Sequence, residues 1–129
     1  IPTGPQEYIR LIEAVDRDRF AVHMDIINMT NSADRYFNAE EFIDECAEVL
    51  GKRIRSCHIK DVHLNERYTL QLEECGPGDG EFPLRHYVEK LNEIDPDMPV
   101  ILEHLNSDDE YLKYLKYLKE TLNGLYKTL

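Results

Sequence analysis

The apolar positions of the chain follow a helical spacing in four segments. In each segment apolar residues recur three or four positions apart, which predicts a helix with one face turned toward a core. Between these segments lie three short runs that are almost continuously apolar, and such runs are typical of buried strands. The predicted order is helix 6–15, strand 20–28, helix 39–50, strand 54–60, loop 61–81, helix 84–91, strand 99–105 and helix 108–125.

Strands that alternate with helices pair in parallel through right-handed crossovers. The sequence therefore predicts an α/β fold with about three parallel strands and four helices. An eight-stranded (β/α) barrel needs about 200 residues or more, whereas this chain has 129. If these units belong to such a barrel, the chain holds only part of it.

Local signals mark the ends of several predicted helices. Asn38 with Glu41, and Ser107 with Glu110, have the spacing of a capping box, so each pair predicts a helix start. Gly51 directly follows the second helical segment, where helices commonly end on a residue that tolerates a positive φ.

The segment 61–81 has no helical period. It contains a candidate short strand at 68–72 and the turn-forming sequence Gly-Pro-Gly-Asp-Gly at 76–80. The glycine-rich turn lacks the spacings GxxxxGK[ST] and GxGxxG of nucleotide-binding loops. It therefore indicates a loop at the rim of a site rather than a phosphate cradle.

The charge of the chain bears on its partners. Lys and Arg number 15 against 26 Asp and Glu, which gives a formal net charge of −11. Such a surface repels polyanions, and no stretch gathers enough basic residues to offset this locally, so nucleic acid and acidic membrane surfaces are not expected partners. Metal cations and small polar ligands remain compatible with it.

The sequence also bears on the cellular compartment. No apolar run approaches the roughly 18 residues of a membrane span, and the start of the chain has no secretory signal pattern. The three cysteines form no CxxC pair, and their odd number favours a reducing compartment. A cytoplasmic protein is the simplest interpretation.

Each of the three predicted strands ends on a polar group that a buried strand does not need. These residues are Asp25, His58 and Glu103. Because the carboxyl ends of parallel strands meet at one edge of a sheet, we expect the three side chains to converge. Two carboxylates and an imidazole can hold a divalent cation. A helix cap or a surface charge is the alternative for any one carboxylate.

Three further polar residues adjoin this set and are candidate substrate-binding residues. His23 precedes the aspartate by two positions and so shares its face of the strand; a place in the core is the alternative. Lys60 could hold substrate charge, or pair with Asp61 at the sheet rim. Asn28 could bond a substrate hydroxyl, or cap the next turn. The other histidines have no supporting pattern and are predicted to face solvent: His63, His86 and His104.

The order of these motifs resembles a known family. VHMDIIN, SCHIKD, a loop containing ECGPGDGEFPL, and PVILEH are similar to the C-terminal half of the sugar phosphate isomerase/epimerase superfamily, the xylose isomerase-like (β/α)₈ barrels. The similarity covers nearly the whole chain. It implies that residues 1–129 form the C-terminal half of a TIM barrel whose N-terminal half is absent.

The resemblance also implies roles for the polar residues. Such barrels hold a divalent metal through Glu, Asp, His and Glu from successive strands, so Asp25, His58 and Glu103 would be the second, third and fourth ligands. Glu103 would also be one of two glutamates that move the substrate proton, and the first Glu would lie upstream of Ile1. Asn28 stands where ketose 3-epimerases carry a substrate-contacting His, which implies a different substrate. Mn²⁺ is the expected metal, with Mg²⁺, Co²⁺ and Zn²⁺ as alternatives.

The implied function of the intact protein is metal-dependent isomerisation or epimerisation of a sugar, sugar phosphate or small hydroxy-carbonyl compound through an enediolate. The alternative is a catalytically silent half-barrel that only associates or binds. An isolated part of a barrel exposes two sheet edges and an apolar interior, so completion by self-association into a homo-oligomer is expected. A plain binding domain without metal is a third possibility.

Overall fold

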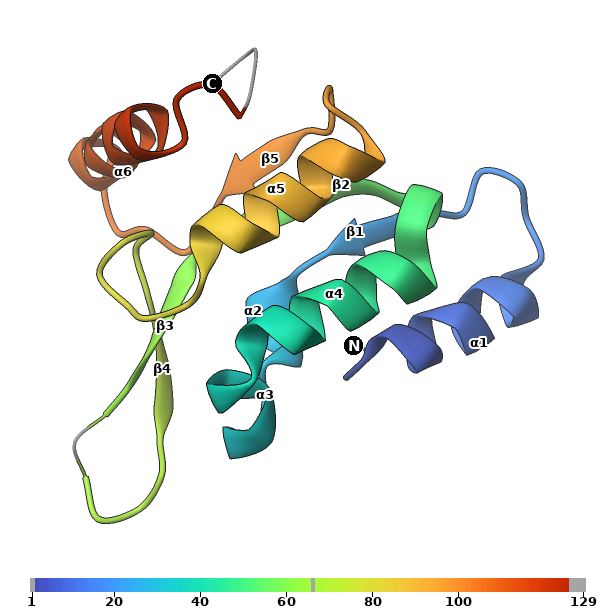
Figure 1. Ribbon diagram of the computed structural model, residues 1–129, viewed down its shortest axis with the longest axis horizontal. Coiled ribbons are helices and arrows are strands. Elements are labelled where there is room, and N and C mark those ends of the chain that lie inside the picture. Colours follow the sequence, from blue (N-terminus) through green and yellow to red (C-terminus); the bar gives the residue numbers. More distant parts are fainter. Residues whose placement is uncertain (1, 66, 126–129) are drawn as a thin grey trace.

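A three-stranded parallel sheet organises the chain (Figure 1). The computed structural model describes residues 2–65 and 67–125. Within these ranges β1 (Val22–Met24), β2 (Ile54–Ile59) and β5 (Val100–Leu102) lie in the order β1-β2-β5, and both pairings are parallel. The predicted α/β class with three parallel strands is confirmed.

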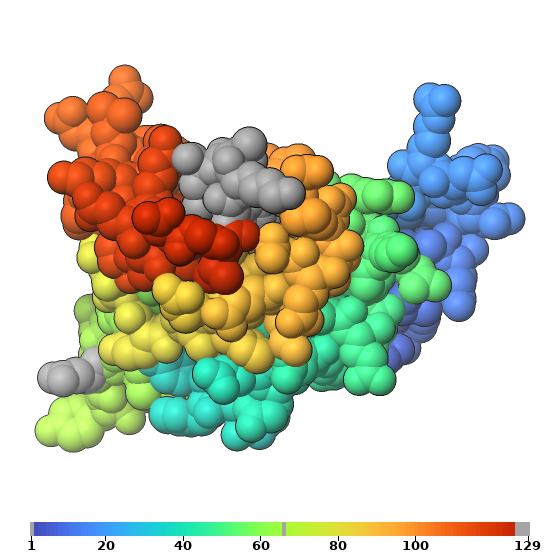
Figure 2. Space-filling model, turned by 45° about the horizontal axis from the view of Figure 1, so that its top comes forward, coloured from blue at the N-terminus to red at the C-terminus, as the bar shows by residue number. Residues whose placement is uncertain are grey.

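Helices cover one face of this sheet. α1 (Pro5–Val15) packs against α4 (Ala39–Leu50), and α4 packs against α5 (Leu84–Ile94). α6 (Asp108–Thr121) follows β5, and Figure 2 shows it next to α5 on the helical side. Within the described ranges, no helix is long and apolar enough to cross a membrane.

The two faces of the sheet differ in composition because successive strand residues point in opposite directions. The face toward the helices, called the outer face below, is buried and carries Val22, Met24, Cys57 and Ile59. The opposite face, called the inner face below, carries His23, Ser56, His58 and Ile101. Ile101 is 46% exposed, so the inner face is open.

The first strand is shorter than its apolar run predicts. β1 ends at Met24, because the Asp25 carboxylate accepts a hydrogen bond from the Asn28 backbone N–H at 3.0 Å and begins a helix there. The predicted strand over 26–28 was therefore wrong. Besides the four predicted helices, the described residues form three short ones: α2 (Ile26–Met29), α3 (Ala33–Phe37) and the 3₁₀ helix η1 (Gly51–Arg53).

An antiparallel hairpin extends from the end of β2. Its strands are β3 (Asp61–Leu64) and β4 (Leu72–Cys75). The predicted strand at 68–72 was wrong apart from Leu72, since pairing with β3 draws the acidic end of the segment into the ladder. The glycine-rich turn at 76–80 is confirmed, and it follows β4 directly.

Of the three predicted helix ends, two are confirmed and one was wrong. Ser107 caps α6, accepting a hydrogen bond from the Glu110 backbone N–H at 3.3 Å, as predicted. Gly51 ends α4 at φ +47°, a conformation that favours glycine. Asn38 precedes α4, but its side chain donates to Asp34 instead of capping α4, so the predicted capping box there was wrong.

Candidate metal centre

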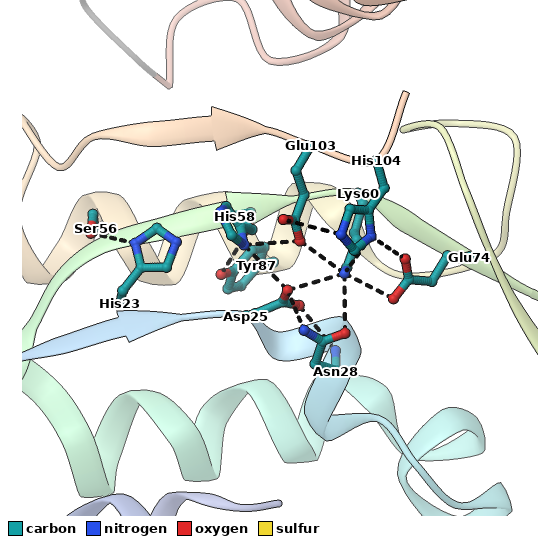
Figure 3. Close-up of polar contacts among 10 residues, drawn as sticks. All are labelled: His23, Asp25, Asn28, Ser56, His58, Lys60, Glu74, Tyr87, Glu103 and His104. Carbon is teal, nitrogen blue, oxygen red and sulfur yellow. Dashed lines mark hydrogen bonds and ion pairs between the residues drawn. The ribbon is translucent and has the colours of Figure 1, made fainter. Parts of the chain in front are cut away.

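Three side chains meet at the carboxyl edge of the sheet (Figure 3). Asp25 follows β1, His58 lies near the end of β2, and Glu103 follows β5. His58 Nδ1 is 3.3 Å from Asp25 Oδ2 and 2.9 Å from Glu103 Oε1. One ligand atom from each residue lies within 4.8 Å of the others. The predicted convergence is confirmed.

Asp25 is fixed by its position between a strand and a helix. Its Oδ1 caps α2, and its Oδ2 accepts a hydrogen bond from Asn28 Nδ2 at 2.7 Å. Burial acts to raise the pKa of Asp25. Its contacts with Glu103, Asn28 and Lys60 outweigh this and hold the pKa below its ordinary value. Asp25 is therefore both a helix cap, as the alternative interpretation had it, and an ionised oxygen donor in the cluster.

The Lys60 side chain lies between three carboxylates. Its side chain is only 2% exposed, and Nζ is 3.0 Å from Asp25 Oδ2, 2.9 Å from Glu103 Oε1 and 2.8 Å from Glu74 Oε1. Burial acts to lower the pKa of Lys60, but these carboxylates raise it above its ordinary value. Lys60 is therefore a buried cation matched by several acidic groups.

The carboxylate of Asp61, the residue after Lys60, has a different role. Asp61 is buried and accepts hydrogen bonds from the backbone N–H groups of Val62, Gly78 and Phe82 at 2.8–2.9 Å. It thereby anchors the glycine-rich loop beside the cluster, although burial still raises its pKa. The suggested pairing of Lys60 with Asp61 was wrong, because consecutive residues of an extended chain point to opposite faces.

His23 lies on the inner face beside His58, as strand alternation predicts. The two rings meet edge to face with centroids 4.1 Å apart, and His23 Nδ1 is 2.6 Å from Ser56 Oγ. Burial and the nearby His58 lower the pKa of His23. His23 is exposed, so the alternative of a core histidine was wrong.

Two residues of the cluster were not singled out from the sequence. Glu74 comes from β4, and its Oε2 lies 2.6 Å from His104 Nδ1. His104 has φ +58°, and this left-handed turn brings its ring to 3.5 Å from Lys60 Nζ. His104 is exposed, as predicted, but it also lies at the rim of the site. The other two histidines pair with different carboxylates: His63 with Glu73, and His86 with Asp44.

The glycine-rich loop packs against α6. A Cβ at Gly76 would collide with the Tyr114 ring, and one at Gly78 would collide with the Tyr117 ring. The Tyr114 hydroxyl donates a hydrogen bond to Asp79. These glycines therefore allow two aromatic rings to approach the loop, which places the loop at the rim of the site, as predicted.

The arrangement is that of an α/β protein with a candidate ligand site at the carboxyl edge of a parallel sheet. Parallel strands with crossover helices place two carboxylates and an imidazole at the carboxyl ends of the strands, where α/β enzymes bind ligands. This donor set fits a divalent cation, and its two oxygen donors favour the harder ions. Three protein donors leave coordination positions for further ligands.

Comparison with known proteins identifies the family. The chain belongs to the xylose isomerase-like TIM barrel family, which matches residues 3–121. The three strands are accordingly part of a (β/α)₈ barrel, as the sequence motifs indicate. A solved structure, that of a xylose isomerase domain protein from Planctomyces limnophilus, is similar with a TM-score of 0.68 and 25% identity over 95% of this chain. The chain spans 43% of the length of that protein. Among curated proteins, none matches significantly.

Proposed function

We propose that the whole protein isomerises or epimerises a sugar, sugar phosphate or small hydroxy-carbonyl compound with a divalent metal, through an enediolate. This chain would supply the C-terminal half of the barrel. The observation that carries the proposal is the convergence of Asp25, His58 and Glu103 at the carboxyl edge of the sheet. Family membership supports it, since the fold places ligand-binding residues at this edge.

Asp25, His58 and Glu103 are the residues that would hold the metal, with Mn²⁺ preferred and Mg²⁺, Co²⁺ or Zn²⁺ as alternatives. When bound, the metal supplies Lewis-acid polarisation of a substrate carbonyl. The cluster already accommodates a cationic group, because Lys60 Nζ lies within 3.0 Å of both carboxylates.

Glu103 is the proposed proton carrier. Its carboxylate borders the open inner face and contacts both His58 and Lys60. In this position it would act as a base and remove the proton next to the substrate carbonyl, and a second group across the substrate would act as the acid that returns a proton to the enediolate. Lys60, Asn28 and His23 are the proposed substrate contacts. A second acid–base group would come from the other half of the whole protein.

Metal binding by this chain tests the ligand assignment. We expect Mn²⁺ at 100 times its Kd to stabilise the fold by about 2.7 kcal/mol in thermal or urea unfolding. Asp25→Asn and Glu103→Gln should each remove most of that stabilisation. Glu93→Gln, which removes an exposed carboxylate on α5, is the matched control. Equal stabilisation of all four proteins would contradict the assignment.

Turnover by the whole protein tests the role of Glu103. Glu103→Gln keeps the shape of the side chain but removes the base, so we expect turnover to be abolished with the fold intact. Circular dichroism and the unfolding midpoint serve as controls for folding. Activity within a few-fold of the unsubstituted protein would refute the role of Glu103.

A second candidate function is that this chain acts as an associating half-barrel. The exposed side chain of Ile101 on the inner face favours it, and so does Leu112 on α6, which is 65% exposed. Light scattering after size exclusion should then show a homo-oligomer, and Ile101→Lys should shift it toward monomer. A monomer at all concentrations up to millimolar excludes this function.

We also propose a cytoplasmic location. The three cysteines of the chain, Cys46, Cys57 and Cys75, are free. Burial raises the pKa of each thiol to about 12, which keeps it protonated and unreactive. Free thiols are typical of a reducing compartment.

A further inference from the structure

A cavity lies between the hairpin and α2, beside the candidate metal centre. Its volume is about 340 Å³, and it is lined by α2, by residues 30–32 and by both strands of the hairpin. Figure 1 shows the hairpin projecting beside α2 and α3. The cavity is called the hairpin pocket below. Cavities that bind small molecules begin at about 300 Å³, so the hairpin pocket can hold a group of modest size.

The hairpin gives this pocket an apolar wall. Alternation along the paired strands places Val62 and Leu72 on one face of the hairpin, and both line the pocket. Leu70 and Ile27 line it as well. Leu70 is 55% exposed, so apolar surface of this wall is in contact with water. Covering that surface with an apolar ligand group is therefore favourable.

The uncharged polar side chains of the hairpin pocket already have partners within the protein. The Thr30 hydroxyl donates a hydrogen bond to the Ile26 carbonyl at 2.9 Å. The Ser32 hydroxyl accepts one from the Arg35 backbone N–H at 3.2 Å, and Asn31 Oδ1 accepts one from the Arg35 side chain at 3.3 Å. A polar ligand group would compete with these bonds, whereas an apolar group leaves them intact.

Two further lining residues connect the hairpin pocket to the metal centre (Figure 3). Asn28 Oδ1 and Glu74 Oε1 lie 3.1 Å and 2.8 Å from Lys60 Nζ, so the charge of Glu74 is paired. Asn28 Nδ2 also donates a hydrogen bond to Asp25 Oδ2. The proposed metal ligands are not among the residues that line the pocket. A metal ion held by them would therefore leave the apolar wall unchanged.

Both sides of the hairpin pocket belong to this chain. α2 follows β1, the hairpin follows β2, and these two strands are neighbours in the sheet. A (β/α)₈ barrel continues from the two outer edges of the sheet, at β1 and β5, and not between β1 and β2. The space between α2 and the hairpin is therefore not where further strands of the barrel would insert.

We propose that the hairpin pocket binds an apolar group, an alkyl chain or an aromatic ring, carried by the compound whose oxygens bind at the metal centre. This rests on the proposed function and narrows its substrate class to hydroxy-carbonyl compounds with an apolar substituent. The oxygen-bearing part of the ligand would lie at Asp25 and Glu103, and the apolar part would lie against Leu70 and Leu72.

A matched pair of chelating probes tests the proposal. Acetohydroxamate and 3-phenylpropanohydroxamate present the same carbonyl and hydroxyl oxygens to a metal and differ in the apolar group. Their dissociation constants are measured by calorimetric titration of the chain saturated with Mn²⁺. Because burial of an aromatic ring is favourable, we expect the phenyl compound to bind about tenfold more tightly or better. Equal or weaker binding of the phenyl compound overturns the proposal.

Two leucine variants locate the bound ring. Leu70→Ser removes part of the apolar wall at an exposed position, so it should reduce the preference for the phenyl compound about threefold or more. Leu11→Ser makes the same change on α1, outside the pocket, where the side chain is 39% exposed, and should leave the preference unchanged. The unfolding midpoint checks that both variants fold. An undiminished preference in Leu70→Ser overturns the assignment of the ring to this pocket.

Light scattering addresses the other occupant, a second copy of the chain. If a second copy covered the hairpin pocket, the two hydroxamates would bind equally. Leu70→Ser would then convert an oligomer to monomer. That combination of results overturns the proposal.

A titration without metal separates the pocket from the proposed function. Benzyl alcohol carries the ring without a chelating group, so at millimolar concentrations it should shift the NMR methyl signals of Ile27, Leu70 and Leu72 but not those of Leu11. Absence of these shifts overturns the pocket. If they occur and Asp25→Asn still binds metal normally, the proposed ligand set fails while the pocket stands.

Discussion

The outer and inner faces of the sheet are built by the same three strands but make opposite kinds of contact. Outer-face residues such as Met24, Cys57 and Ile59 are buried against α4 and α5 in the core. The inner face and its carboxyl edge carry histidines, carboxylates and one lysine, which contact one another through ion pairs and hydrogen bonds. Strand alternation alone separates the two sets.

The difference between the faces shows which residues stabilise the fold and which are available to bind ligands. Burial of apolar side chains on the outer face is the main stabilising contribution to folding. The inner-face groups retain access to solvent and ligands, at the cost of bringing like charges together. Lys60 is the most deeply buried of these charged groups, with 2% of its surface exposed. Substitutions on the two faces should therefore change the free energy of unfolding in different ways.

The largest effect on the free energy of unfolding is expected at Lys60. Lys60→Met leaves Asp25, Glu74 and Glu103 close together without their cation, and removing one partner of a buried ion pair destabilises proteins by about 3–5 kcal/mol. Urea unfolding without metal should show this loss, and saturating Mn²⁺ should restore part of it because a cation returns to the cluster.

Lys90→Met is the matched control. Lys90 pairs with Asp44 at 3.2 Å on the helical surface, and surface pairs contribute little to stability because solvent screens them. If Lys60→Met and Lys90→Met lower the free energy of unfolding by the same small amount, the stability of the inner face does not depend on Lys60. Electrostatic interactions would then not distinguish the two faces.

A pair of isoleucines compares the two faces directly. Ile59 on the outer face is 1% exposed, whereas Ile101 on the inner face is 46% exposed. Ile59→Ala should cost about 3 kcal/mol, since it leaves a cavity in the core. Ile101→Ala makes the same chemical change on the neighbouring strand and should cost about 1 kcal/mol or less. Similar losses in urea unfolding would mean that the inner face is also covered in solution.

The outer face was the more predictable of the two from sequence. The core residues of α4 and α5 recur at helical spacing, so both helices were predicted together with their buried positions. α2 was missed because Ile26 and Ile27 continue the apolar run of β1, and period alone does not separate a short buried helix from a strand. The hairpin was missed because Glu73 and Glu74 interrupt the apolar pattern of β4.

The site was predictable as far as the parallel strands determine it. Asp25, His58 and Glu103 occupy equivalent strand ends, so topology alone brings them together. Glu74 reaches the cluster only because β4 pairs with β3, and His104 only because its backbone is left-handed. Neither feature has a local sequence signal. Contacts that depend on long-range pairing therefore remained outside the sequence prediction.

The smallest effect concerns the polar contact between α6 and the glycine-rich loop. The hydrogen bond from the Tyr114 hydroxyl holds the pKa of Asp79 below its ordinary value, against a smaller opposing effect of burial. A depressed carboxyl pKa stabilises the fold at pH values above the ordinary Asp value of about 3.9, and this stabilisation is lost as the pH falls through the lowered value. Because the Asp79 side chain is about half exposed and solvent screens its charge, Tyr114→Phe should cost less than about 1 kcal/mol at pH 7 and less still at pH 3.

The same unfolding series on Tyr117→Phe isolates this contact, because it removes a hydroxyl from α6 without touching the bond to Asp79. Its difference from the unsubstituted protein should be small and independent of pH. The Ile59→Ala difference should likewise be the same at pH 3 and pH 7, since an apolar outer-face contact gains no protons. A Tyr114→Phe difference close to zero at both pH values would show that the loop is attached by ring packing on Gly76 alone, because phenylalanine keeps the ring. The polar edge would then be stabilised in the same way as the apolar face.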